Sequence, residues 1–395
     1  MELNIQSGAL LLLIAAVVAM ISRRLRLPYS VGLVSAGIVI ALLPFSPNIT
    51  LTRDLLFTVF LPPLIFEAAF YLNWRHLKRD MPVVLTLATA GVALSAVITA
   101  GGMHYLAGWP WISASVFGVL IAATDPVSVI ATFKEARAEG RLLLLIESES
   151  LFNDGTAAVL FAIVLDTAFG GSFSLPQAGL RLIGATAGSL LCGGFIAGVA
   201  LALAGRTQDH LVEITFTTVA AYGSFLLAER FHFSGVIATL TAGMILGNVG
   251  RLGIISSRGR EAVQAFWEYA AFVANSFVFL LIGMREANQN FRSAWPAIAV
   301  GIVLVVVARA VSVYACCIPF ARTALRVAPQ HQHVLVWGGL RGALALALSL
   351  ALPAEMPFRE SIVTVCFAVV AFSVFAQGLT LTPLLRRFKE IPPAS

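Results

Sequence analysis

Long apolar runs separated by short polar loops constrain this chain more than any other feature of its sequence. Most runs have about 17–25 residues, the length that an α-helix needs to cross the hydrocarbon core of a bilayer. Charged residues make up 12% and hydrophobic residues 59% of the 395 residues, whereas a soluble domain has about 25% charged residues. The sequence therefore predicts an all-α polytopic membrane protein. We place thirteen transmembrane helices at 8–22, 28–44, 54–72, 82–104, 112–133, 146–166, 180–205, 210–229, 233–250, 262–284, 294–319, 332–352 and 360–385.

The loops between these runs are short, so we expect residues 1–395 to form a single transmembrane domain without a soluble domain. Most of the 26 Lys and Arg residues fall in loops on one side of the predicted helices, and such an excess marks the cytoplasmic side. This bias predicts an N-terminus outside and a C-terminus in the cytoplasm. The basic residues form no patch with aromatic side chains, so we expect a lipid bilayer and no nucleic acid as the partner.

The thirteen predicted helices can be divided into two inverted groups of six around a single helix, the plan of many secondary transporters. In that plan the helix at 112–133 corresponds to the helix at 332–352. Both contain helix-breaking residues at mid-span: a proline directly after Asp125, and three glycines between residues 338 and 342. Paired interruptions at corresponding positions indicate a substrate site.

Acidic side chains inside the apolar runs indicate what that substrate is. An ionisable side chain at the bilayer centre costs about 2.5–3.5 kcal/mol on insertion scales, so it usually marks a functional site. Asp154 and Ser150 are four residues apart and share one face of a helix. The proline after Asp125 can free the carbonyl of Thr124. We expect these oxygens to bind a hard monovalent cation, with Glu67 facing the same cavity.

More conservative interpretations exist for each of these residues. The carboxylates could belong to a polar network that only packs helices together. Asp125 could cap a helix that is kinked by the proline. Glu67 could mark the cytoplasmic interface instead of the cavity.

Two arginines also lie within the apolar runs, and a buried arginine must be paired. Glu149 and Asn153 share the helix face next to that of Ser150 and Asp154. We therefore expect Glu149 to pair with Arg341. For Arg309 the partner could be a carboxylate or the carbonyls at a helix break.

Four motifs are similar to those of the sodium/proton exchangers of the NhaP and eukaryotic NHE type, in the monovalent cation/proton antiporter superfamily. They are PPLIFE at 62–67, TDP at 124–126, ESLFNDG at 149–155 and GGLRGALALALSL at 338–350. The resemblance extends over nearly the whole chain. It implies a core domain with two crossed unwound helices, near 125 and 340, a dimerisation domain, and a homodimer.

The resemblance also implies a role for each motif residue. Asp154 resembles the essential aspartate that binds the ion and the proton. The Na⁺ shell would be completed by Asp125, Ser150, Glu67 and the Thr124 carbonyl. Asn153 would mark an electroneutral stoichiometry, and Glu149 would form a structural ion pair with Arg341. The resemblance implies no enzymatic activity and no cofactor. The chain ends soon after the last predicted helix, so regulation through a cytoplasmic tail is not expected.

We therefore expect electroneutral exchange of Na⁺ or Li⁺ for H⁺ by competition at Asp154, with alternating access, in a prokaryotic plasma membrane. Its physiological role would be pH homeostasis. K⁺/H⁺ antiport on the same fold is the main alternative. A cation channel or an organic-anion symporter are alternatives from other classes of transport protein.

Overall fold

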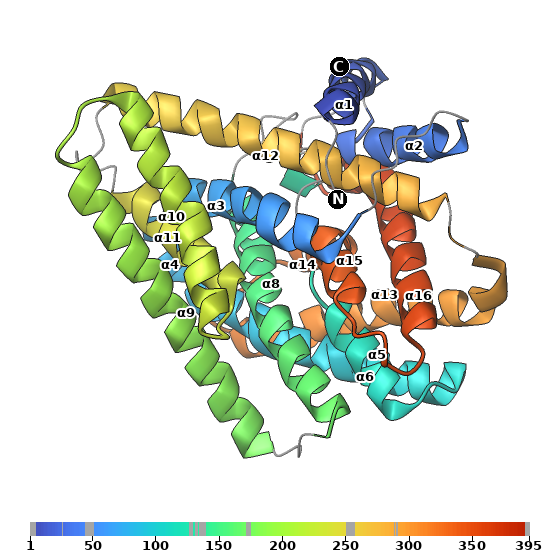
Figure 1. Cartoon of the computed structure of the whole chain (residues 1–395). Helices are drawn as coiled ribbons and strands as arrows, with labels where there is room; N and C mark the ends of the chain where they lie inside the picture. Colours follow the sequence, from blue (N-terminus) through green and yellow to red (C-terminus); the bar gives the residue numbers. More distant parts are fainter. Residues whose placement is uncertain are drawn as a thin grey trace. The chain divides into compact units, whose positions relative to one another are not determined.

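The computed structural model describes residues 5–25, 27–43, 51–125, 129–130, 133, 140–170, 175–249, 257–287, 289 and 291–391. In this described part the regular secondary structure is helical, apart from one isolated β-bridge, and turns and short irregular segments connect the helices (Figure 1). The helices up to the middle of the chain are α1 Ile5–Leu25, α2 Tyr29–Leu42, α3 Leu61–Tyr71, α4 Trp74–Thr86, α5 Val92–Ala107, α6 Trp111–Leu120, α8 Arg141–Ala168 and α9 Leu175–Ala204. The remaining helices are α10 His210–Arg230, α11 Gly235–Val249, α12 Ser257–Glu286, α13 Trp295–Cys317, α14 Pro329–Trp337, α15 Ala343–Leu350, α16 Arg359–Phe372 and α17 Gly378–Arg387.

Short π-helical and 3₁₀ segments extend several of these helices. The π segments are η1 Leu55–Phe60 before α3, η2 Leu87–Gly91 between α4 and α5, and η6 Ser373–Gln377 between α16 and α17. The 3₁₀ segments are η4 Phe291–Ala294 and η5 Ile318–Phe320, on either side of α13. A π segment places an extra residue in the turn without ending the helix, so α4 to α5 and α16 to α17 each continue as one long helix.

Eight helical segments in the described residues are long and apolar enough to cross a membrane. They are Gly8–Leu25, Trp74–Ala107, Arg141–Ala168, Pro176–Ala204, His210–Arg230, Gly259–Glu286, Trp295–Phe320 and Arg359–Arg387. Four shorter apolar helices accompany them, at Tyr29–Leu42, Leu55–Tyr71, Trp111–Leu120 and Gly235–Val249. These segments support the prediction that the chain is an integral membrane protein.

The chain divides into two compact units. The first unit contains Met1–Arg53, Val83–Asn153 and Asn275–Ser395. Within it, α5 packs against α6 and α13, α13 against α14 and α16, and α15 against α16. The C-terminal part of α12 lies so close to α2 that Gly283 faces the backbone of Val34 and Gly37 faces that of Leu280. Small residues allow such close helix packing where no water drives the helices together.

The second unit contains Asp54–Pro82 and Asp154–Ala274. Its helices α9, α10 and α11, green to yellow in Figure 1, pack against one another, and α11 also packs against α3. Its core is built on Phe66, Phe70 and Trp267, which are buried against alanines of the neighbouring helices. The indole N–H of Trp267 donates a hydrogen bond to the Thr217 hydroxyl at 3.0 Å, which satisfies the one polar group of this buried side chain.

One predicted boundary is wrong by a full two turns. The helix expected at 82–104 begins at Trp74, and Pro82 lies inside α4. The segment before Pro82 is amphipathic: Leu77 and Asp80 are buried, whereas Arg75, Lys78 and Arg79 are exposed. The exposed basic residues interrupt the apolar run, so the sequence predicts a loop where the structure has a half-polar helix.

Candidate functional site

Two breaks in the helices of the first unit contact each other. The first follows the end of α6 and extends from Ile121 to Asp125, and the second separates α14 from α15 and extends from Gly338 to Gly342. The backbone N–H of Asp125 donates a hydrogen bond to the carbonyl of Leu340 at 2.7 Å, which forms the isolated β-bridge. Pro126, which we expected to cause the first break, lies outside the described residues.

The second break can approach Asp125 because it contains glycine. A Cβ atom on Gly342 would overlap the carboxyl group of Asp125. The Asp125 side chain therefore lies directly against the backbone of the second break and is partly exposed. A side chain at position 342 would force one of the two to move.

Arg341 donates hydrogen bonds to backbone carbonyls of the first break. Its side chain is 1% exposed, and its Nη1 donates to the carbonyls of Ala122 and Ala123 at 2.6 and 2.8 Å. These carbonyls lie just beyond the end of α6, where helical acceptors lose their regular donors. The Nε and Nη2 atoms of Arg341 have no hydrogen-bond partner among the described residues. Arg341 therefore acts as a cap on freed carbonyls.

The predicted pairing of Glu149 with Arg341 is wrong. Glu149 instead accepts two hydrogen bonds from Arg309, from Nη1 at 2.8 Å and from Nη2 at 2.9 Å. Both side chains are buried. Arg309 also donates from Nε and Nη2 to the carbonyl of Leu335, at 3.2 and 3.1 Å. The bidentate geometry uses the two parallel donors of the guanidinium, the strongest arrangement for an arginine and a carboxylate.

The second break also makes room for Arg309. A Cβ atom on Gly339 would come within 2.6 Å of Nε of Arg309. The carbonyl that Arg309 binds belongs to Leu335, in the last turn of α14, where carbonyls lack helical donors. Arg309 thus has both kinds of partner considered from the sequence, a carboxylate and carbonyls at a helix end.

Asn153 joins this ion pair to the first break. Its Nδ2 donates to Glu149 Oε1 at 2.9 Å and to Thr124 Oγ1 at 2.6 Å, and its Oδ1 accepts from the N–H of Thr124 at 3.2 Å. The Thr124 hydroxyl also lies 3.1 Å from the Ser150 hydroxyl. All four side chains are buried. The network therefore depends on a side chain at position 153 that both donates and accepts, as an amide does.

The remaining residues of the predicted cation shell belong to the second unit. Asp154 is the residue of α8 after Asn153, and the boundary between the two units falls between them. Glu67 lies in α3. Both carboxylates are partly exposed. That Asp154 and Glu67 join Asp125, Thr124 and Ser150 in one cation site stays a prediction.

Hydroxyl and carbonyl oxygens have an important part in this predicted shell. No group of three or more His, Cys, Asp or Glu in the described ranges could hold a metal ion. Thr124 and Ser150 supply hydroxyl groups that already contact each other. Sodium ions, as hard cations, accept oxygen ligands of each of these kinds, so the shell does not require a cluster of carboxylates alone.

The residue that sequence reasoning left unassigned is Arg309. Its position inside VVVARAVSVY showed that it needed a partner. Nothing in the sequence distinguished Arg309 from Arg341 as the partner of Glu149, because both lie in apolar segments far along the chain. The backbone acceptors at Leu335, Ala122 and Ala123 become available only where the helices end.

Comparisons with known proteins agree with the motif resemblance. The family model described as "Sodium/hydrogen exchanger, transmembrane" matches residues 10–387. The chain is 38% identical to the Na⁺/H⁺ antiporter ApNhaP of Aphanothece halophytica over 365 residues, which cover 92% of this chain and 70% of that protein. It is 37% identical to the low-affinity Na⁺/H⁺ antiporter NhaS1 of Synechocystis, over 97% of this chain and 74% of that protein.

A solved structure supports the fold. The sodium proton antiporter MjNhaP1 from Methanocaldococcus jannaschii superposes on this chain with a TM-score of 0.78 at 21% sequence identity, over the full length of both chains. The resemblance inferred from the four motifs is therefore confirmed by the match of nearly the whole sequence. This chain belongs to the sodium/hydrogen exchanger family.

Proposed function

We propose that this chain is a secondary transporter that exchanges Na⁺ for H⁺ across a membrane. The similarity to proteins named Na⁺/H⁺ antiporters supports the substrates. The observation that carries the mechanism is the hydrogen bonding of Asn153, which uses its neutral amide to bridge Glu149 and Thr124. Glu149 is already neutralised by Arg309. Asp154, the next residue of α8, is the carboxylate that we assign to the transported ions.

A single carboxylate that holds either a cation or a proton gives an electroneutral exchange. When Asp154 carries Na⁺ in one direction and H⁺ in the other, both loaded forms have the same charge. Na⁺ would be bound by Asp154, Asp125, Ser150 and Glu67 with the carbonyl of Thr124, and Li⁺ by the same oxygens. A membrane potential imposed with K⁺ and valinomycin should therefore leave the exchange rate unchanged.

The architecture in which this exchange would occur is that of an inverted-repeat transporter. We propose thirteen transmembrane helices in two inverted groups of six, with two crossed unwound helices near residues 125 and 340. The bond between the N–H of Asp125 and the carbonyl of Leu340 supports this crossing. Access would alternate between the two sides of a prokaryotic plasma membrane, with the N-terminus outside, the C-terminus in the cytoplasm, and a homodimer as the functional unit.

The test is Na⁺-driven dissipation of a preformed pH gradient in proteoliposomes. The variant Asp154→Asn removes the charge with little change of shape, so it should abolish the Na⁺ response. Asp166→Asn is the matched control, because Asp166 is an exposed residue of the same helix that pairs with Arg181. The control should transport like the wild type.

Three results would contradict the proposal. Full activity of Asp154→Asn would remove this residue from the mechanism. A response to K⁺ but not to Na⁺ would retain the exchange and change its substrate. A cation current without proton coupling would indicate a channel.

A further inference from the structure

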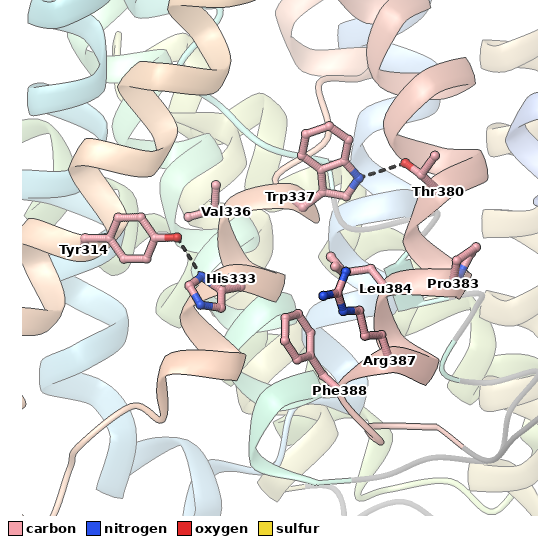
Figure 2. Close-up of a pocket in the computed structure, with 9 residues that line it drawn as sticks. All are labelled: Tyr314, His333, Val336, Trp337, Thr380, Pro383, Leu384, Arg387 and Phe388. Atoms are coloured by element: carbon pink, nitrogen blue, oxygen red, sulfur yellow. Dashed lines mark hydrogen bonds between the residues drawn. The ribbon is translucent and has the colours of Figure 1, made fainter.

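A groove lies in the first unit between the C-terminal end of α13, the helix α14 and the last turns of α17. Its volume is about 630 Å³, within the range of small-molecule binding sites. Figure 2 shows the side chains that line it, which are Tyr314, His333, Val336, Trp337, Thr380, Pro383, Leu384, Arg387 and Phe388. Most of this lining is apolar or aromatic. We call it the α14–α17 groove.

The position of this groove along the helices corresponds to a membrane surface. The apolar segments Trp295–Phe320 and Arg359–Arg387 are long enough to cross a bilayer, and both end beside the groove. Tyr and Trp, which line it, are enriched where a helix leaves the hydrocarbon for the headgroup region. The basic residues Arg386, Arg387 and Lys389 occur at the C-terminal end of α17 and just after it. The groove is therefore expected at the depth of lipid headgroups.

The charge of the groove is positive. Arg387 is the one arginine or lysine among the described residues that line it, and none of these is acidic. Its guanidinium points into the groove between Trp337 and Phe388 (Figure 2). The nearby carboxylate of Glu390 is 3.1 Å from Nε2 of His331, and neither residue lines the groove. The guanidinium is thus placed to bind an anion.

The other polar groups of the lining have partners. His333 Nδ1 lies 2.7 Å from the Tyr314 hydroxyl, and the Trp337 indole donates to Thr380 Oγ1 at 2.9 Å. His333 also stacks on the ring of Phe388, with the ring centroids 5.7 Å apart. These contacts fix the orientation of the aromatic walls. They leave flat apolar surfaces beside a single guanidinium.

We propose that the α14–α17 groove binds an anionic phospholipid. The phosphate would accept hydrogen bonds from Arg387, whose guanidinium matches the geometry of phosphate oxygens. The acyl chains would lie on Val336, Pro383 and Leu384. Basic pockets between transmembrane helices bind anionic headgroups in this way. Trp337 is the last residue of α14, directly before the second helix break, so the bound lipid would contact the helix that leads into the site.

The binding test does not depend on transport. The purified full chain is stripped of lipid in detergent, and the first binding event of phosphatidylglycerol is titrated by native mass spectrometry. Phosphatidylcholine with the same acyl chains is the zwitterionic comparison, which has a phosphate but no net charge, and glycerol 3-phosphate is the headgroup without chains. The variant Arg387→Gln removes the guanidinium. Arg386→Gln is the matched control, because Arg386 is an exposed neighbour that does not line the groove.

The wild type and Arg386→Gln should bind phosphatidylglycerol about tenfold more tightly than phosphatidylcholine, as expected for one charge-assisted contact that is partly exposed to water. Arg387→Gln should lose this preference. The proposal is overturned if the wild type shows no preference, if Arg387→Gln keeps it, or if Arg386→Gln loses it equally. Binding of glycerol 3-phosphate as tight as that of the lipid would also overturn it, because the groove would then be a site for a soluble phosphate.

Discussion

Replacing Arg309 by methionine should destabilise the protein strongly, because it leaves Glu149 as a buried carboxylate without its cation. Breaking a buried ion pair by removing one partner costs about 3–5 kcal/mol. The same change removes both donors from the carbonyl of Leu335. Methionine keeps an unbranched apolar side chain in the space of the arginine, so the loss of packing is small. We expect a total loss of at least about 3 kcal/mol.

Arg341→Met is the comparison that tests the corrected pairing. Arg341 bonds only to the carbonyls of Ala122 and Ala123 in the described part of the chain, and two of its nitrogens lack partners there. Removing it costs the lost carbonyl bonds, about 1–3 kcal/mol, and relieves the burial of an incompletely bonded cation. The loss should therefore be smaller than for Arg309→Met.

Thermal unfolding in detergent, followed by tryptophan fluorescence at a fixed scan rate, measures both variants. An unfolding entropy of about 2.1 cal/mol/K per residue converts 3 kcal/mol into a fall in Tm of about 4 °C for a chain of this length. The loss of stability in the double variant Glu149→Gln/Arg309→Met should be smaller than the sum of the losses in the two single variants, because the two side chains are in contact. The larger loss of stability in Arg309→Met than in Arg341→Met should persist at high salt, since the ion pair of Glu149 and Arg309 is buried. Equal losses for Arg309→Met and Arg341→Met, or additive single variants, would refute the pairing.

Three further predictions concern the site. Gly342→Ala should lower the transport rate by about 10–100-fold, because its Cβ would displace the Asp125 carboxyl; Gly101→Ala, which meets no other group, is the control in the same proteoliposome assay. Asn153→Asp should lower the Tm more at pH 8 than at pH 5, because only a protonated carboxyl can donate the lost hydrogen bond to Glu149, which contributes about 1.5–3 kcal/mol; an equal effect at both pH values would count against the bridge. The apparent affinity for Na⁺ should weaken as the pH falls, by up to about tenfold per pH unit, if the proton and the cation compete for one carboxylate; an affinity independent of pH would exclude simple competition.

The positions of the membrane helices could be predicted from sequence where apolar length alone defines them. The predicted runs 210–229 and 233–250 correspond to α10 His210–Arg230 and α11 Gly235–Val249. The start of α4 could not be predicted in the same way. Its exposed Arg75, Lys78 and Arg79 interrupt the apolar run. Leu77 and Asp80, three residues apart, are buried on the other face of the helix. The helical character of this segment is visible only as a periodicity of buried residues along one face, not as an apolar run.

The polar contacts of the candidate site were predictable only in part. Thr124 and Ser150 belong to motifs that suggested a common site, and their hydroxyl groups are 3.1 Å apart. The choice of Arg309 over Arg341 as the partner of Glu149 depends on which donors face which acceptors after the helices break. Broken helices expose backbone carbonyls as acceptors, and such acceptors have no residue type that a sequence could reveal. A buried arginine such as Arg341 can therefore donate to backbone carbonyls without an acidic partner.

The hydrogen bond between the N–H of Asp125 and the carbonyl of Leu340 joins the two breaks through main-chain atoms alone. Every substitution with a natural amino acid except proline leaves both atoms in place, so a scan of side chains cannot remove this bond. Variants of Asp125 would report on its carboxyl group and would leave the main-chain connection unmeasured. Incorporation of the α-hydroxy acid analogue of aspartate at position 125, which replaces the N–H by an ester oxygen, would remove the bond and retain the carboxyl group. Chemical mutagenesis of the backbone is thus the way to measure how far exchange depends on the contact between the two breaks.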